Sequence, residues 1–366
     1  MSDETWMGRA LEAARKGRPS PNPHVGAVVV QGDEVVGVGH HERAGQEHAE
    51  LIALREAGAK AEGATLYVTL EPCNHTGRTP PCTDAIAAAK IRRVVIGATD
   101  PNPHVKGGGV ERLKELGIAV QVGVQEAAAR DLIRSWTKYV TVGLPYVSLK
   151  LALSIDGRIA TKSGASRWVT GKLARAKVHA LRAKSDAIAV GIGTVLADDP
   201  RLTVRDTQGQ NPTRIVFDTK LRTPVSSALV VGARETPTWI VTGDTPESRH
   251  GAQELEAKGI RILFAPVSTE GRVELRSALE ALAAEGIVTL MVEGGAELAG
   301  SFLAAELADE LHAFLAPVLF GPRGRPGAVD WAGPATPEVA PRIAKPVWEL
   351  CGEDAYVHGA LRYPER

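Results

Sequence analysis

The chain has 366 residues, more than one hydrophobic core usually supports, so we expect two domains. Lys and Arg together number 43 and equal Asp and Glu, without the basic excess that is typical of a dedicated nucleic-acid binder. No stretch approaches the roughly 18 consecutive apolar residues of a membrane helix, and residues 1–17 form an amphipathic helix pattern, not a secretory signal. We therefore expect a cytoplasmic protein that acts on small molecules, without nucleic-acid or membrane partners. Cys73, Cys82 and Cys351 are too few for a disulfide framework.

The first 140 residues alternate between short apolar runs and helical patterns. The predicted strands are 25–30, 34–39, 64–70, 92–98 and 118–123. The predicted helices begin near Met1, His48, Cys82, Gly109 and Gln125. This alternation is typical of an α/β sheet that is covered on both faces. The last helix is expected to run to about Tyr139, and "TVGLP" (141–145) then breaks the pattern, which predicts a first domain of 1–144 and a second of 145–366.

The second domain shows a similar α/β alternation. Its predicted strands are 146–154, 186–191, 213–218, 238–242, 260–265 and 288–294, and its predicted helices are 171–184 and 296–307. The tail 348–363 predicts two strands joined by a turn, and the Pro- and Gly-rich segment 322–342 predicts a surface loop. In "GIGTVLADDP" (191–200) we expect a flexible turn before an acidic loop. The glycine turns do not match G-x-G-x-x-G, so a Rossmann fold is not supported.

One group of residues in the first domain has the composition of a metal site. His48 and Glu50 are two residues apart at the start of a predicted helix. Residues at this spacing lie on nearly opposite sides of a helix, so both can reach one site only if that site lies in front of the open N-terminal end. Cys73 and Cys82 are separated by eight residues, and the helix that Cys82 opens would stabilise its thiolate. His48, Cys73 and Cys82 suit zinc with a fourth position left open, and Glu50 would move a proton from water to a leaving amine. The alternative is a helix-start histidine and two buried structural cysteines.

The motifs around these residues resemble a known family. "PNPHVGAVVV" (21–30), "HAE" (48–50), "EPCNHTGRTPPC" (71–82) and "TDPNPHVKGGG" (99–109) are similar to the deaminase domain of the bifunctional riboflavin-biosynthesis deaminase–reductases. The resemblance implies a cytidine-deaminase-like three-layer α/β/α fold, with Zn²⁺ bound as above and Glu50 as the proton shuttle. It also implies substrate contacts from Asn22, His41, His75, Arg78, Asp100 and Asn102. The guanidinium group of Arg78 could bind a phosphate by two parallel hydrogen bonds. The alternatives are that the Asn and Asp residues shape turns and that the histidines are surface residues.

Segments of the second domain resemble the reductase domain of the same family, which has a dihydrofolate-reductase-like α/β fold and uses NADPH. These segments are 150–160, 163–170, 181–205 and 291–303. The resemblance implies cofactor contacts from Ala152, Trp168, Thr194, Asp198, Thr242, Gly295, Ala296, Glu297, Leu298, Ala299, Gly300 and Ser301. It implies substrate contacts from Ser166, Arg182, Leu202, Arg205 and Glu293.

For four polar residues of the second domain, a role also follows from their chemistry. Lys150 and Glu293 lie on otherwise apolar strands, where burial is costly unless they are paired, and we expect them to orient the sugar and assist its protonation as catalytic residues. Arg182 and Arg205 could clamp a ribose phosphate. The alternatives are solvated surface arginines, and Trp168 could equally be a core residue.

The leading hypothesis is therefore a bifunctional enzyme. Its first domain would deaminate 2,5-diamino-6-(5-phosphoribosylamino)pyrimidin-4(3H)-one, and its second would reduce the ribosyl chain of 5-amino-6-(5-phosphoribosylamino)uracil with NADPH. We expect small phosphoribosyl pyrimidines as ligands and a homo-oligomer. One alternative is an RNA-editing zinc deaminase with an accessory domain, which would need a basic stripe and two cysteines separated by only two residues. The other is a non-catalytic zinc-scaffolded binding module, against which the retention of Glu50 argues.

Overall fold

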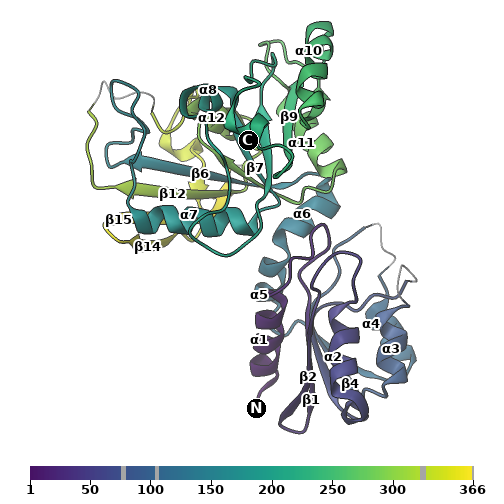
Figure 1. Ribbon diagram of the computed structural model, residues 1–366. Helices are drawn as coiled ribbons and strands as arrows, with labels where there is room; N and C mark the ends of the chain where they lie inside the picture. The colour runs from purple at the N-terminus through teal and green to yellow at the C-terminus, as the bar shows by residue number, and fades with distance from the viewer. Residues whose placement is uncertain (76–79, 104–106, 322–326, 365–366) are drawn as a thin grey trace. The chain divides into compact units, whose positions relative to one another are not determined.

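The computed structural model describes residues 1–75, 80–103, 107–321 and 327–364 (Figure 1). The chain forms two compact units, Met1–Leu144 and Pro145–Arg366. None of the helices in these described ranges combines the length and the apolar character that crossing a membrane requires.

The first unit is built on a sheet whose order is β2-β1-β3-β4-β5 within the described ranges. The strands are β1 (Gly26–Gln31), β2 (Glu34–His40), β3 (Thr65–Leu70), β4 (Arg93–Ala98) and β5 (Ala119–Val122). β1 is antiparallel to β2 and β3, whereas β3, β4 and β5 run parallel. All five predicted strands are confirmed to within one residue at each end.

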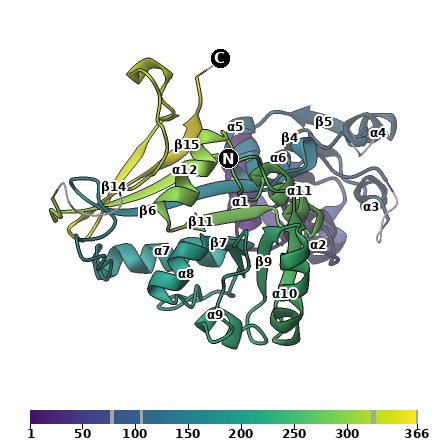
Figure 2. The same cartoon turned by 90° about the horizontal axis from the view of Figure 1, so that it is seen from above.

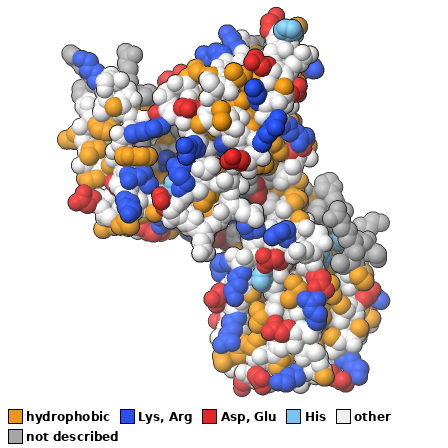
Figure 3. All heavy atoms as spheres, in the orientation of Figure 1, with side chains coloured by type: hydrophobic (Ala, Val, Ile, Leu, Met, Phe, Trp, Pro, Cys, Tyr) orange, Lys and Arg blue, Asp and Glu red, His pale blue; other side chains and the backbone are white. Residues whose placement is uncertain are grey.

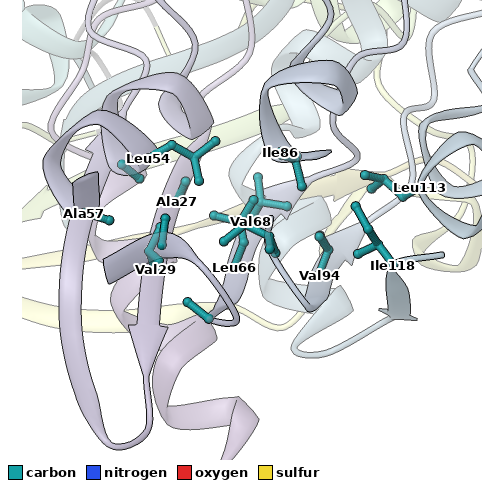
Figure 4. Close-up of a cluster of buried hydrophobic side chains, with 14 of the residues drawn as sticks. Ala27, Val29, Leu54, Ala57, Leu66, Val68, Ile86, Val94, Leu113 and Ile118 are labelled. Atoms are coloured by element: carbon teal, nitrogen blue, oxygen red, sulfur yellow. The ribbon is translucent and has the colours of Figure 1, made fainter. Parts of the chain in front are cut away.

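Helices cover both faces of this sheet. They are α1 (Asp3–Ala14), α2 (Ala49–Ala57), α3 (Cys82–Ala88), α4 (Gly109–Glu115), α5 (Glu126–Leu132) and α6 (Arg134–Val142), with a short 3₁₀ turn at Gly58–Ala61. Alternate residues of β1 point to opposite faces, so Ala27 and Val29 pack under α2, α3 and α4 (Figure 4), whereas Val28 and Val30 pack under α1 and α5. The result is the expected three-layer unit.

One helix prediction in this unit is wrong. The single helix expected from about Gln125 to Tyr139 is two helices, α5 and α6, and the second continues to Val142. The break falls at Ile133, whose backbone lies outside the helical region at φ −103° and ψ 10°.

Two glycines on β2 bring α2 close to the sheet. A Cβ at Gly39 would lie 2.0 Å from the Ala49 carbonyl oxygen, and a Cβ at Gly37 would lie 2.1 Å from that of Ala53. Both neighbours belong to the α2 backbone and cannot rotate away. Because His48 and Glu50 lie at the start of α2, this contact fixes their position.

The second unit contains a ten-stranded sheet among its described residues. The strands are β6 (Tyr146–Ser154), β7 (Ala187–Gly191), β8 (Thr213–Phe217), β9 (Thr238–Gly243), β10 (Arg261–Ala265), β11 (Thr289–Glu293), β12 (Glu310–Ala316), β13 (Arg342–Ile343), β14 (Val347–Cys351) and β15 (Asp354–Arg362). The order is β10-β9-β8-β7-β11-β6-β12-β15-β13, with β14 also paired to β15. The seven strands that come first in this order, from β10 at one edge of the sheet through β9, β8, β7, β11 and β6 to β12, all run parallel. β15 runs antiparallel to β12.

The six predicted strands of this unit and the two strands of the tail are confirmed, but β12 and the two-residue β13 were not predicted. The helices are α7 (Lys172–Lys184), α8 (Ile192–Asp198), α9 (Ala228–Val231), α10 (Pro246–Ala257), α11 (Leu275–Ala284) and α12 (Ala296–Ala304), with a 3₁₀ turn at Pro337–Val339. α7 and α12 were predicted, whereas α9, α10 and α11 were not. The flexible turn expected within 191–200 is wrong, because α8 begins directly after β7. Figure 2 shows α7, α8 and α10 on one side of the strands and α12 on the other.

The close contact at Gly39 generates a stability prediction. Gly39→Ala should lower the free energy of unfolding of the Met1–Leu144 unit by about 1–3 kcal/mol, because the new methyl group overpacks against the α2 backbone. Gly8→Ala is the matched control, since its Cβ would meet only the Gln125 side chain at 3.4 Å and alanine favours the helix by about 0.5–1 kcal/mol. Chemical denaturation with pulsed hydrogen exchange and mass spectrometry separates the two units. Equal stability of the two variants would contradict the proposed contact.

Candidate active sites

The first candidate site gathers the three predicted metal ligands of the Met1–Leu144 unit. His48 is the N-cap of α2, Cys73 follows β3, and Cys82 is the first residue of α3. His48 Nδ1 lies 3.2 Å from Cys82 Sγ and 3.5 Å from Cys73 Sγ. The ligand atoms of all three residues lie within 4.8 Å of one another. One imidazole and two sulfur ligands form a donor set that fits zinc and leaves one tetrahedral position for a reactant.

The three ligands form an electrostatically coupled group. The pKa of the Cys73 thiol is lowered to about 4, mainly by hydrogen bonding from the Cys82 side chain and, against the effect of burial, from His48. The pKa of Cys82 is raised by its contact with Cys73 and by burial. The pKa of His48 is raised, chiefly by the contact with Cys73. One thiolate is thus already favoured, and a bound cation would release the remaining protons, as metal binding to thiol and imidazole ligands does.

Glu50 lies in the first turn of α2 and is only 3% exposed. Burial raises the pKa of its carboxyl group, against the opposing charge of His48. A carboxyl group with a raised pKa can accept a proton and give it up again near neutral pH, which is what a general acid–base residue must do.

Asn22 and His41 lie beside the ligand group. Asn22 Nδ2 is 2.9 Å from His41 Nε2, and His41 Nδ1 is 3.0 Å from the Glu47 carbonyl oxygen. The His41 ring meets the His48 ring edge-on at 5.5 Å between centroids. Burial lowers the pKa of His41, so the ring is neutral, with Nδ1–H donating to Glu47 and Nε2 accepting from the Asn22 amide. The structure therefore brings both predicted residues to the site.

The other predicted substrate contacts of this unit differ in where the structure places them. Asp100 Oδ1 accepts a hydrogen bond of 2.8 Å from the Asn102 backbone N–H, so these residues do shape a turn. Burial raises the pKa of Asp100, and its backbone N–H donates to Glu71, two residues before the ligand Cys73. His75 is exposed. Arg78 lies outside the described residues.

Glu71 was not predicted from the sequence. Its carboxylate accepts hydrogen bonds from the backbone N–H groups of Asp100, at 3.2 Å, and Val110, at 3.1 Å. It thereby ties the Cys73 loop to the "DPNP" turn and to α4. The only sequence signal was its position two residues before Cys73.

The second candidate site is a cavity of about 1310 Å³ in the Pro145–Arg366 unit. It lies at the carboxyl ends of the parallel strands β6, β7, β8 and β11, where α/β sheets usually bind ligands. In Figure 3, Lys and Arg side chains gather on the face of this unit that is turned to the viewer.

Most of the residues predicted for the second site line this cavity. They are Lys150, Ala152, Ser166, Trp168, Arg182, Thr194, Asp198, Leu202, Arg205, Glu293, Gly295, Ala296, Glu297, Leu298 and Ser301. Thr242, Ala299 and Gly300 do not line it. The Thr242 hydroxyl is buried and donates to the Thr219 carbonyl oxygen at 3.2 Å. A Cβ at Gly300 would lie 2.0 Å from the Asp330 carbonyl oxygen, so this glycine serves packing of α12.

A buried charge cluster forms the polar wall of the cavity. Arg182 donates two hydrogen bonds to Glu293, of 2.6 Å from Nε and 2.8 Å from Nη2, and Lys150 Nζ lies 3.6 Å from the same carboxylate. Burial opposes ionisation of Glu293, but the charges of Arg182 and Lys150 outweigh it and lower its pKa to about 2. Burial lowers the pKa of Lys150. Arg182 therefore orients Glu293, and its third nitrogen donates to the Thr203 carbonyl oxygen at 3.0 Å.

The glycine turn after β11 forms another wall. Gly294 and Gly295 have φ values of 76° and 83°, in the left-handed region that disfavours other residues. Thr194 lies against both glycines, so β-carbons there would crowd it. The turn delivers the chain directly into α12, whose N-terminal N–H groups favour an anion.

Trp168 is not a core residue, because 68% of its surface is exposed. The Arg175 guanidinium lies 4.5 Å from the centre of its ring, and both side chains line the cavity. Ser166 Oγ donates to Asp198 Oδ1 at 3.0 Å, which links two predicted contacts.

Several basic residues of the cavity were not predicted. Lys220 and Arg222 follow β8, Arg272 precedes α11, and His179 lies on α7. The sequence "DTKLR" (218–222) after a predicted strand was an available signal, since ligands bind at the carboxyl ends of parallel strands.

The comparisons with known proteins agree with this two-site arrangement. Residues 145–356 match the family model described as the RibD C-terminal domain, and residues 1–98 match the cytidine and deoxycytidylate deaminase zinc-binding region. The riboflavin biosynthesis protein RibD of Aquifex aeolicus is 46% identical over 87% of this chain and 88% of its own length.

Solved structures show the same similarity over the whole chain. Acinetobacter baumannii RibD matches with a TM-score of 0.86 and 37% identity, covering 98% of this chain and 99% of the other. A Thermotoga maritima protein described as a diaminohydroxyphosphoribosylaminopyrimidine deaminase/5-amino-6-(5-phosphoribosylamino)uracil reductase matches with a TM-score of 0.85 and 36% identity, covering 99% of both chains. The expected fold class, a deaminase-like α/β unit followed by a reductase α/β unit, is confirmed. The chain belongs to the RibD family of riboflavin biosynthesis and is an enzyme with a zinc-binding deaminase domain and a reductase domain.

Proposed function

We propose that this chain carries out two successive steps on one phosphorylated substrate. The first is hydrolytic deamination of 2,5-diamino-6-(5-phosphoribosylamino)pyrimidin-4(3H)-one, and the second is NADPH-dependent reduction of the ribosyl chain of the resulting uracil to the ribityl form. The observation that carries the proposal is the presence of two chemically different sites, a Cys–Cys–His group beside a buried glutamate and a basic cavity with a buried Lys–Glu–Arg cluster. The two activities named for the Thermotoga maritima relative support the same pair of reactions.

In the deamination step, His48, Cys73 and Cys82 would hold Zn²⁺. When bound, zinc supplies the Lewis acidity that makes water a nucleophile at neutral pH. Glu50 would accept a proton from the attacking water and deliver it to the leaving amine, since its raised pKa suits both transfers. The Asn22 amide and the neutral His41 ring would hold the pyrimidine next to the ligand group, with His75, Arg78, Asp100 and Asn102 on the ribosyl phosphate side.

In the reduction step, the cofactor would lie against Ala152, Trp168, Thr194, Asp198 and the start of α12. The nicotinamide supplies hydride to the sugar carbon when it is bound. Lys150 would donate the proton that the sugar oxygen requires, because burial lowers its pKa and makes it a better acid. Glu293 holds Lys150 in place, and Arg182 holds Glu293. Ser166, Leu202 and Arg205 would contact the substrate, with Arg205 at its phosphate.

The cavity also offers a basis for the preference for NADPH over NADH. The two nicotinamide cofactors differ by the 2′-phosphate, a dianion that basic side chains recognise. Lys220 and Arg222 line the cavity just beyond β8 and are exposed. We assign them to the 2′-phosphate.

The proposal includes self-association of the chain. β14 exposes Trp348 and Leu350 on one face and Val347 on the other, and Leu350 is 79% exposed. Such a strand is commonly covered by a partner.

Glu50→Gln tests the order and separation of the two steps. Ammonia release from the diaminopyrimidine substrate should fall by about a hundredfold to ten-thousandfold, because amide nitrogen cannot relay the proton. The zinc content should not change, since Glu50 is not a ligand. NADPH oxidation should stop with this substrate and return to the wild-type rate when the deaminated uracil is supplied.

The matched control for that experiment is Glu47→Gln. Glu47 lies three residues away, is exposed and pairs with Arg55, so both reactions should proceed as in the wild type. Loss of zinc from Glu50→Gln, or undiminished ammonia release, would overturn the assignment of Glu50. Ammonia release without NADPH oxidation on either substrate would overturn the second activity only.

Lys220→Ala and Arg222→Ala test the cofactor assignment. Each should lower kcat/KM for NADPH by about tenfold to a hundredfold, the cost of one charge-assisted hydrogen bond, and leave kcat/KM for NADH nearly unchanged. Steady-state kinetics with both cofactors measure the ratio. Lys258→Ala, which removes an exposed lysine at the end of α10, should leave the ratio as in the wild type. Parallel losses with NADPH and NADH would contradict the assignment.

A further inference from the structure

A second group of metal-ligating side chains lies in the Pro145–Arg366 unit, next to the active-site cavity but outside its lining, since His312 pairs with the cavity residue Lys150 across β12 and β6. It consists of Glu310 and His312 on β12 and His358 on β15. None of the three lines the cavity. They lie on the same face of the sheet as Phe314 and Tyr356, which pack under α7.

The strand geometry brings these side chains to one point. Glu310 and His312 are two residues apart, so they project from the same face of β12. His312 is paired directly with His358 in the antiparallel register of β12 and β15, which places their Cβ atoms roughly 4.5–5.5 Å apart. One ligand atom from each residue lies within 4.8 Å of those of the other two.

A second layer of contacts orients the ligands. His312 Nδ1 lies 2.7 Å from Tyr356 Oη, and His312 Nε2 lies 3.8 Å from Glu310 Oε1. When Nδ1–H donates to the tyrosine oxygen, Nε2 keeps its lone pair and faces the carboxylate. A histidine whose other ring nitrogen is held by a hydrogen bond is the usual arrangement in metal sites.

Charge and burial also favour a cation at this point. Glu310 and His312 are buried, and the carboxylate lies 3.8 Å from His312 Nε2, so an ion bound here would be held close to a negative charge. The His358 side chain is 26% exposed, so an ion can reach the group from solvent.

We propose that Glu310, His312 and His358 form a second divalent-metal site, which fastens the C-terminal strand β15 to β12. Two imidazoles and one carboxylate suit a borderline transition ion such as Zn²⁺. Metal–ligand bonds of about 2.1 Å require ligand atoms about 3.4 Å apart, so the three side chains close inward by a small rotation, chiefly of the partly exposed His358.

Metal stoichiometry tests this site on the full chain. The protein is stripped with a chelator, dialysed against Zn²⁺ and assayed by mass spectrometry of the metal. Wild type should hold two ions per chain, and His358→Ala and Glu310→Gln should each lose one of them. His250→Ala, which removes an exposed histidine of α10, should keep two. The proposal would be overturned if both His358→Ala and Glu310→Gln kept two ions. It would also be overturned if the wild type itself held no second ion that these variants could lose.

Cobalt distinguishes this site from the cysteine-containing one. Co²⁺ bound by Cys73 and Cys82 gives a thiolate charge-transfer band, whereas the second equivalent should add only ligand-field absorption. In the double variant Cys73→Ser/Cys82→Ser, the thiolate band should vanish while one equivalent of Co²⁺ stays bound. Adding His358→Ala to the double variant should then remove this remaining equivalent. Loss of all metal from the double variant would refute the second site, whereas a wild type without the thiolate band would refute only the cysteine site. Because His358 is partly exposed, its alanine variant should keep the circular dichroism spectrum of the wild type and remain interpretable if Glu310→Gln unfolds.

Discussion

Both sites depend on one constraint of α/β sheets, that parallel strands need crossover connections whose turns meet at the carboxyl edge. β3 leads through Cys73 to α3, and β11 ends at Glu293 and leads through Gly294 and Gly295 to α12. Each turn therefore delivers reactive groups to a place where helix N-termini also converge. In the first unit the close contact of α2 with β2 completes this arrangement, because it holds the helix start that bears His48 and Glu50.

The fold could be predicted where short-range patterns decide the structure. Apolar runs such as β3 and β4 are bounded by turn residues, and their burial needs no knowledge of their neighbours. β12 was missed because "ELHAFLA" consists largely of helix-favouring residues and follows a helix, so only its pairing with β6 and β15 makes it a strand. α8 was mistaken for a turn because Gly191 and Gly193 flank its start, although a glycine before a helix is compatible with an N-cap.

The site predictions follow the same division. The His48, Cys73 and Cys82 group was recognisable because each residue stands next to an element start or end that the sequence itself marks. The bond from Arg182 to Glu293 joins residues 111 positions apart, and composition gives no sign of it. Sequence therefore suggested Arg182 as a phosphate clamp, whereas in the structure its guanidinium orients the buried carboxylate. Glu71 was missed for the same reason, since its role depends on backbone groups of two distant segments.

The buried acidic groups also favour a catalytic protein over a non-catalytic zinc-scaffolded module. Burying Glu50 raises its pKa, so the fold bears the cost of a carboxyl group that a purely structural zinc site would not need. Glu293 is ionised in a similar setting only because Arg182 and Lys150 surround it. A non-catalytic module would gain stability by replacing such clusters with apolar residues, as buried ion pairs often allow. Their presence in both units is what two active enzymatic sites require, and it agrees with membership of a family whose two domains are a deaminase and a reductase.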